Sequence, residues 1–141
     1  MSQAIRIDGK ARAAQMSTDI TRQTRDLIDQ HGIKPGLAVV IVGEDPASQV
    51  YVRNKKRTAE ACGFDSTQHS LAASATQDEV LSLIDQLNAD PKVHGILVQL
   101  PLPAHLDELR ITQSILPGKD VDGFHFDNIG RLTSGHLDAA F

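Results

Sequence analysis

An unbroken apolar run from Leu37 to Val42 is the feature that most constrains the fold of this chain. The run shows no alternation between apolar and polar residues, so it predicts a strand buried on both faces, as in parallel sheets. Pro46 follows closely and suits the first position of a helix, where its missing N–H costs nothing. Because helix and strand patterns keep alternating along the chain, the sequence predicts an α/β domain. We expect a three-layer sandwich, with a mainly parallel sheet flanked by helices.

Three long helices are predicted from the signals at their ends. Gly32 can end the first helix, while Thr76 and Glu79 have the spacing of a capping box for the third. Ala14, Ile20, Leu27 and Ile28 roughly follow the inner face of the first helix. The expected helices run from Asp8 to about Gln30, from Pro46 to about Cys62, and from Thr76 to Asp90.

Two further strands and a short helix complete the expected elements. The segment 64–71 is polar enough to be an edge or near-edge strand, whereas the apolar segment 93–98 predicts a buried one. A short helix is expected over residues 106–116, followed by a loop rich in turn formers over residues 117–123. The tail from residue 130 onward is less patterned.

Composition excludes several classes of function. The 141 residues suit one core-forming domain, with 40% apolar and 23% charged residues. A net charge of −4 gives no support to nucleic-acid binding, and no apolar run approaches the ~20 residues that span a bilayer. Cys62 is the only cysteine, so no intrachain disulfide can form, and the N-terminus lacks the apolar core of a secretory signal. We therefore expect a cytoplasmic protein with no nucleic-acid or membrane partner.

Ser48, Tyr51 and Lys55 fall within one narrow sector of the second predicted helix, at about 100° per residue. Ligands of α/β proteins usually sit at the carboxyl ends of the strands, and this helix follows such an end. A hydroxyl, a phenol and an amine would then point the same way. This arrangement could hold a flat ligand and place a proton-transferring amine against it.

Two later segments add an amide and a pair of carboxylates. Gln99 directly follows the predicted strand 93–98, where parallel sheets place ligand contacts, and an amide can donate and accept at once. Asp120 and Asp122 precede Gly123 in the predicted loop. A carboxylate there could accept paired N–H bonds from a heterocycle or help to bind a metal, although no calcium-loop spacing is present.

Each of these residues also has a simpler structural interpretation. Lys55 could belong to a solvated basic run with Arg53, Lys56 and Arg57. Gln99 could be a strand-end amide that bonds to a neighbouring loop. In the same way, Tyr51 could be a half-buried aromatic residue, Ser48 could satisfy backbone N–H groups, and Asp120 and Asp122 could form Asx-turns.

The sequence lacks the usual metal and dinucleotide motifs. Its six histidines are scattered, and no HExxH motif or Cys/His cluster exists, so no metal site is expected. Neither a P-loop nor a G-x-G-x-x-G motif is present. The segment Gly43-Glu44-Asp45-Pro46 has too few glycines to cradle a pyrophosphate.

Three segments taken together resemble one known family. They are Val42-Gly43 with Ser48-Gln49-Val50-Tyr51-Val52-Arg53-Asn54-Lys55-Lys56, then Gly95-Ile96-Leu97-Val98-Gln99-Leu100-Pro101-Leu102-Pro103, then Pro117-Gly118-Lys119-Asp120-Val121-Asp122-Gly123-Phe124, with Asn128-Ile129-Gly130-Arg131-Leu132 behind them. In this order and spacing the chain is similar to the N-terminal, catalytic domain of the bifunctional methylenetetrahydrofolate dehydrogenase/methenyltetrahydrofolate cyclohydrolase family. The resemblance covers essentially the whole chain.

The resemblance implies that a tetrahydrofolate derivative binds in a cleft beside this domain. It implies that Lys55 is the catalytic amine, that Gln99 tunes and orients it, and that Tyr51 stacks on or lies against the pterin. It also implies that Asp122 binds the amino and ring N–H groups of the pterin and that Ser48 is a supporting contact. The implied reactions are the oxidation of 5,10-methylenetetrahydrofolate with NADP and the hydrolysis of the 5,10-methenyl product to 10-formyltetrahydrofolate, in one-carbon metabolism and purine biosynthesis.

In that family a linking helix and a Rossmann domain that carries NADP follow this domain. We expect residues 1–122 to form the folate-binding catalytic domain and residues 123–141 to lead toward the absent NADP-binding domain. Dehydrogenase activity is therefore not expected from this polypeptide alone, and the full-length enzyme is expected to be a homodimer. Two alternatives stay open: a non-catalytic pterin-binding module, and the substrate domain of a shikimate-type dehydrogenase.

Overall fold

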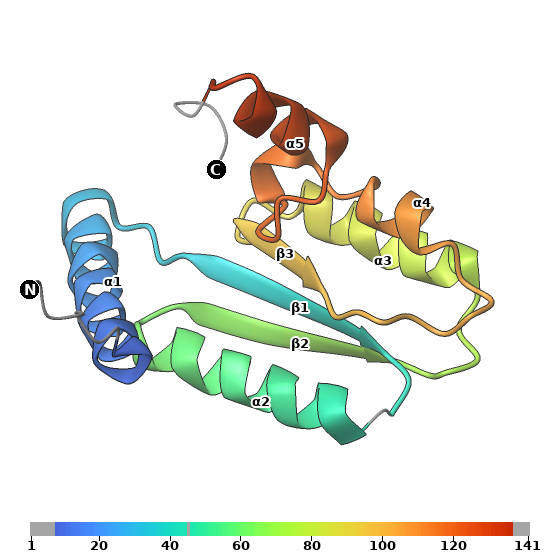
Figure 1. Cartoon of the computed structure of the whole chain (residues 1–141), viewed down its shortest axis with the longest axis horizontal. Coiled ribbons are helices and arrows are strands. Elements are labelled where there is room, and N and C mark those ends of the chain that lie inside the picture. Colours follow the sequence, from blue (N-terminus) through green and yellow to red (C-terminus); the bar gives the residue numbers. More distant parts are fainter. Residues whose placement is uncertain (1–7, 45, 137–141) are drawn as a thin grey trace, which may run out of the picture.

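Helices and strands alternate along the chain, as the α/β prediction requires (Figure 1). The computed structural model describes residues 8–44 and 46–136, without the side chains of residues 46–49. The elements are α1 (Gly9–His31), β1 (Gly36–Val42), α2 (Pro46–Ala61), β2 (Asp65–Leu71), α3 (Gln77–Ala89), β3 (Gly95–Val98), α4 (Glu108–Thr112), η1 (Pro117–Lys119) and α5 (Phe126–Thr133).

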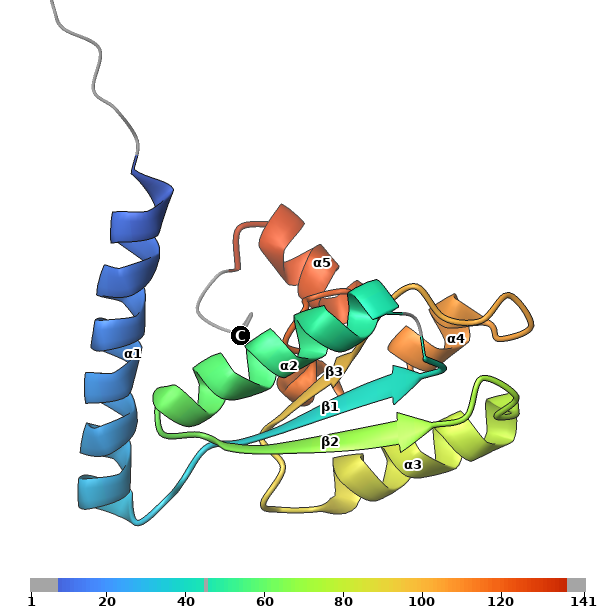
Figure 2. The ribbon, with the colours of Figure 1, turned by 90° about the horizontal axis from the view of Figure 1, so that it is seen from below.

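The strands of the described residues form a parallel sheet in the order β2-β1-β3. β1 pairs with β2 from Gly36 opposite Asp65, and with β3 from Leu37 opposite Gly95. β2 lies at an edge, as its polar sequence predicted. Figure 2 shows α2 on one face of the sheet and α3 on the other, so the three-layer sandwich is confirmed.

Successive residues of β1 enter two different cores, because strand side chains alternate between faces. One core lies on the α2 face and contains Val39, Ile41, Val52 and Leu97, with Leu37 packed against it. The other core lies on the α3 face and includes Ala38, Val40, Val42, Val80, Ile84, Leu87, Ile96 and Val98. The apolar run therefore contains no polar residue because both of its faces are covered.

The predicted ends of α1 and α3 are confirmed. The Asp8 carboxylate accepts a hydrogen bond from the backbone N–H of Ala11 at 3.0 Å, and Gly32 ends α1 in the left-handed region at φ 65°. At α3, the backbone N–H of Thr76 donates to Glu79 at 2.7 Å, and the backbone N–H of Glu79 donates to the Thr76 hydroxyl at 3.2 Å. Both bonds of the capping box are therefore present.

The expected inner face of α1 is turned toward the rest of the chain, since Ile20 and Leu27 line a groove with Phe64, but it is covered only in part. Ile20 is 37% exposed and Leu27 is 36% exposed, Ala14 is exposed, and Ile28 is only partly buried. Thr24 is instead the buried residue of this helix. Figure 1 shows the physical reason: α1 stands beyond one end of the sheet rather than across its face. α1 meets the rest of the chain beside the end of α2, where Thr24 lies against Gly63.

Two expectations near the C-terminal side need correction. The helix expected over residues 106–116 is only α4, because Asp107 caps it by accepting from the Arg110 backbone N–H. Asn88 then holds the following segment by donating to the Ser114 carbonyl and accepting from the Leu116 N–H. Helix α5 was not expected at all, since Gly130 lies within it and it begins between the predicted loop and the tail, where no element was assigned.

We predict that Thr76→Ala lowers the free energy of unfolding by about 1 kcal/mol, because an N-cap hydroxyl satisfies a backbone donor at the start of a helix. The measurement is urea unfolding followed by circular dichroism. Ser82→Ala is the matched control, since it removes an exposed hydroxyl within the same helix and should change stability by a few tenths of a kcal/mol. Equal effects from the two substitutions would contradict the capping role.

Candidate active site

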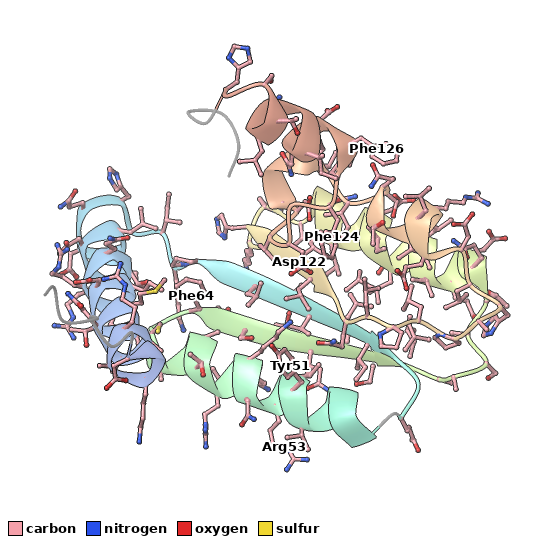
Figure 3. The ribbon with its side chains drawn as sticks, viewed as in Figure 1. Tyr51, Arg53, Phe64, Asp122, Phe124 and Phe126 are labelled. Carbon is pink, nitrogen blue, oxygen red and sulfur yellow. The ribbon has the colours of Figure 1, made fainter. Side chains whose placement is uncertain are left out.

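Lys55 and Tyr51 form a pair on one face of α2. The Lys55 Nζ atom lies 4.9 Å from the centroid of the Tyr51 ring, within the range of a cation–π contact. Val52 is buried in the core beneath the helix and anchors this face to the sheet. In Figure 3, Tyr51 points toward the sheet, whereas Arg53 points away from it.

The basic run of α2 does not behave as one solvated unit. Lys56 forms an ion pair with Glu60, with 3.8 Å between Nζ and Oε1, and Arg53 and Arg57 are exposed. Lys55 is partly buried and lies over the Tyr51 ring instead. Helical periodicity therefore separates Lys55 from its basic neighbours, which favours the functional interpretation of this residue over the solvated one.

A groove of about 510 Å³ lies along the same face of α2. Its lining is mostly apolar, with Lys55 supplying a charged group. Figure 3 places Tyr51 beside α2 and Phe64 near α1, just before the start of β2, so the groove extends from the Lys55 pair past the end of α2 toward α1. Residues along it include Leu37, Tyr51, Lys55, Cys62, Phe64 and Leu97. Such a groove can accept a flat, largely apolar body with a polar end.

Asp122 comes from a distant part of the chain and interacts with Lys55. Burial raises the pKa of Asp122 above its ordinary value, the positive charge of Lys55 opposes this shift, and the negative charge of Asp120 adds to it. The carboxyl group therefore lies within electrostatic reach of the amine on α2. Figure 2 shows that α5, which follows this loop, lies on the same side of the sheet as α2.

The loop that carries Asp122 packs tightly against β3. A Cβ atom on Gly95 would lie only 2.5 Å from Cγ1 of Val121, so the absence of a side chain allows this approach. Asp120 is buried and accepts hydrogen bonds from the backbone of its own loop, whereas Asp122 is exposed as a residue and only its carboxyl group is partly covered. The turn-forming role therefore belongs to Asp120, and the Asp122 carboxyl is not used to close the turn.

Gln99 has features of both proposed roles, the strand-end amide and the ligand contact. Its Nε2 donates to the Leu100 carbonyl at 2.7 Å, which is the strand-end role. Its Oε1 is buried, and among the described residues it has no hydrogen-bond partner. Strand alternation places Gln99 on the same face of the sheet as Leu97 and α2. No direct contact of Gln99 with Tyr51, Lys55 or Asp122 is found in the described part of the chain.

Three further expectations concern Ser48, metal binding and membrane-spanning helices. Ser48 lies in the first turn of α2, but its side chain falls outside the described residues. In the described ranges, no group of three His, Cys, Asp or Glu side chains could hold a metal ion. Among the described helices, none has the length and apolarity needed to cross a membrane. The side chains of Gln113 and Asn128 hold the Asp122 loop. Sequence reasoning gave neither residue a role, although Asn128 stands in one of the segments that carry the resemblance, because their partners are not set by local spacing.

The fold is that of the catalytic domain of one enzyme family. Residues 7–122 match the model of the tetrahydrofolate dehydrogenase/cyclohydrolase catalytic domain, and the chain belongs to this family. It is 58% identical over 135 residues to bifunctional protein FolD 1 of Mesorhizobium japonicum, covering 96% of this chain and 45% of that protein. It is 55% identical over 135 residues to bifunctional protein FolD of Brucella ovis, with the same coverage. The chain thus spans about half the length of the curated relatives it matches.

Solved structures agree with this assignment. The bifunctional FolD methylenetetrahydrofolate dehydrogenase/cyclohydrolase of Campylobacter jejuni superposes with a TM-score of 0.91 at 46% identity, over 95% of this chain and 47% of that one. The FolD of Trypanosoma brucei, complexed with NADP cofactor and inhibitor, gives a TM-score of 0.87 at 38% identity, over 94% and 45%. The predicted family and fold are therefore confirmed.

We predict that Lys55→Met raises the pKa of Asp122 further, because it removes the positive charge that favours the ionised carboxylate. The measurement is a pH titration of the Asp122 carboxyl resonance by ¹³C NMR. Lys56→Met is the matched control, since Lys56 pairs with Glu60 instead, and should leave this pKa unchanged. An unchanged value in Lys55→Met would mean that the two groups do not face each other.

Proposed function

We propose that this chain is the catalytic part of an enzyme that interconverts one-carbon derivatives of tetrahydrofolate. In the complete enzyme, 5,10-methylenetetrahydrofolate is oxidised with NADP, and the 5,10-methenyl product is hydrolysed to 10-formyltetrahydrofolate. The observation that carries the proposal is that Tyr51 and Lys55 of α2 line one apolar groove together, while the Asp122 carboxyl, from a distant segment and not itself a lining residue of the groove, interacts electrostatically with Lys55.

Each proposed role follows from the chemistry of the group. The Tyr51 ring is 60% exposed, so it can lie against the flat pterin. Asp122 can accept hydrogen bonds from the amino and ring N–H groups at the pterin edge. Gln99 has a buried acceptor oxygen on the same face and is proposed to orient Lys55 once substrate is bound. Ser48 is proposed as a supporting contact.

The hydrolysis needs a proton acceptor beside the reacting carbon. Water adds to the cationic methenyl carbon and loses a proton, which the neutral amine of Lys55 can take. The hydroxyl group on this carbon then loses its proton as the C=O bond forms and the bond to N5 breaks. N5 takes up that proton, and the formyl group stays on N10. One water is consumed and one proton is released overall.

The residues of this chain do not fit NADP. The junction between β1 and α2 has Gly43 alone, with no glycine-rich turn at the start of α2 to cradle a diphosphate. We assign no residue here to hydride transfer, and we propose that NADP is bound by a further part of the longer protein. The division into residues 1–122 and 123–141, a homodimer for the complete enzyme, a cytoplasmic location and a place in purine biosynthesis remain proposals with it.

We predict that Lys55→Met lowers the cyclohydrolase rate by about 10²- to 10⁴-fold, because it removes the proposed proton acceptor. The measurement is the decay of 5,10-methenyltetrahydrofolate absorbance, corrected for the uncatalysed rate. Affinity for a reduced folate should be retained. Lys56→Met should keep both rate and affinity, since this neighbour faces Glu60. A chain that binds folate but shows no turnover in its wild-type form would instead be a binding module.

We predict that 5-formyltetrahydrofolate raises the melting temperature of this chain and that shikimate does not. A ligand stabilises the fold by RT ln(1 + [L]/Kd), so a concentration of 100 Kd contributes about 2.7 kcal/mol. The measurement is a thermal-shift titration with both compounds. Stabilisation by shikimate alone would favour the substrate domain of a shikimate-type dehydrogenase.

A further inference from the structure

The Asp120 carboxylate is buried and is the hydrogen-bonding centre of the loop that carries Asp122. Asp120 is only 5% exposed. Its Oδ1 accepts from the backbone N–H of Gly123 at 3.1 Å, and its Oδ2 accepts from the backbone N–H of His125 at 2.8 Å. Its Oδ2 also accepts from the Asn128 side-chain amide at 3.0 Å. Three N–H groups therefore offset the desolvation cost of this carboxylate.

Asn128 completes the connection between the two ends of the loop. It is 2% exposed, and its Nδ2 donates to the Pro117 carbonyl at 2.9 Å as well as to Asp120. Since Pro117 begins η1 and Asn128 lies in α5, one amide joins the element before the loop to the element after it. The backbone of residues 120–125 is thus closed around two buried polar side chains.

The same loop is also held against the sheet. Asp120 forms a parallel bridge with Ile96 of β3, and Val121 packs against Gly95. These contacts determine the position of the loop, while the bonds to Asp120 determine its curvature. Asp122 lies inside the turn that Asp120 closes through Gly123, where φ is 71°. Its carboxyl group lies within electrostatic reach of Lys55.

We propose that Asp120 and Asn128 are positioning residues for Asp122, and that their buried hydrogen-bonded pair holds its carboxylate in the orientation that recognises the pterin edge. This inference rests on the proposed folate function and extends it to two residues that touch no substrate. Asp120 and Asp122, two residues apart and of the same chemical type, then have different tasks. The Asp120 carboxylate shapes the loop, and the Asp122 carboxylate binds the pterin edge.

Asp120→Asn tests this directly, because it keeps the size of the side chain but replaces one acceptor oxygen by a donor. Depending on the orientation of the amide, that NH₂ group would meet the N–H of Gly123 or the N–H groups of His125 and Asn128, which already donate to these positions. The loop must then change shape. Because small misplacements of a binding group are costly, we expect the Kd for 5-formyltetrahydrofolate to rise about tenfold, measured by calorimetry.

A double-mutant cycle with Asp122→Asn separates positioning from general damage. If Asp120 acts through Asp122, Asp120→Asn should weaken folate binding about tenfold in the wild-type background and less than about twofold in the Asp122→Asn background. Equal effects in the two backgrounds overturn the proposal. Gln77→Ala is the matched control: Gln77 also holds a loop by bonding to the backbone of Asp107, but away from this site, so folate affinity should not change.

Asn128→Ala provides a test that needs neither folate binding nor a change of charge. Loosening the loop should remove the partial covering of the Asp122 carboxyl group and so lower its pKa toward the ordinary value, as measured by ¹³C NMR titration. An unchanged pKa of Asp122 in this folded variant overturns the positioning role, even if folate binds. Failure of the wild-type chain to bind 5-formyltetrahydrofolate overturns the proposed function instead, and the titration still decides whether Asn128 holds Asp122.

Discussion

The rest of the structure depends on the burial of β1 between two cores. Val39 and Ile41 face α2, while Val40 faces α3, so the strand has no solvated side. Packing of Val52 onto this sheet fixes the rotation of α2, and that rotation brings Tyr51 and Lys55 to the groove. The position of the proposed catalytic amine is therefore a consequence of the hydrophobic packing of Val52, three residues before Lys55.

Neighbouring residues of the same type have different environments in two places. Lys55 lies over an aromatic ring, while Lys56 pairs with Glu60. The Asp120 carboxylate is buried and accepts backbone hydrogen bonds, while Asp122 is exposed and lies near Lys55. In α2 the separation comes from the helical period, and in the loop it comes from a turn closed by a buried carboxylate. Counting charges along the sequence would miss both distinctions.

Sequence patterns predicted best where one local rule decided the outcome. The capping box at Thr76 and the left-handed end at Gly32 are confirmed because each depends on only a few neighbouring residues. Helix α5 was missed because Gly130 interrupts its local pattern, and the bonds that tie it to the fold join Asn128 to Asp120 and Pro117 earlier in the chain. The face of α1 is less buried than expected for a similar reason, since periodicity cannot tell whether a sheet lies opposite a helix.

The sequence by itself determined the class of fold and the family, because a doubly buried strand and three motifs in order leave few alternatives. It also placed Ser48, Tyr51 and Lys55 on one helical sector, which follows from the geometry of any helix. Only the tertiary structure decided that the Asp122 carboxyl lies near Lys55 and that the Asp120 carboxylate is buried and accepts hydrogen bonds within its own loop. These relations join residues far apart in the chain, and packing across the sheet, rather than local spacing, sets their distances.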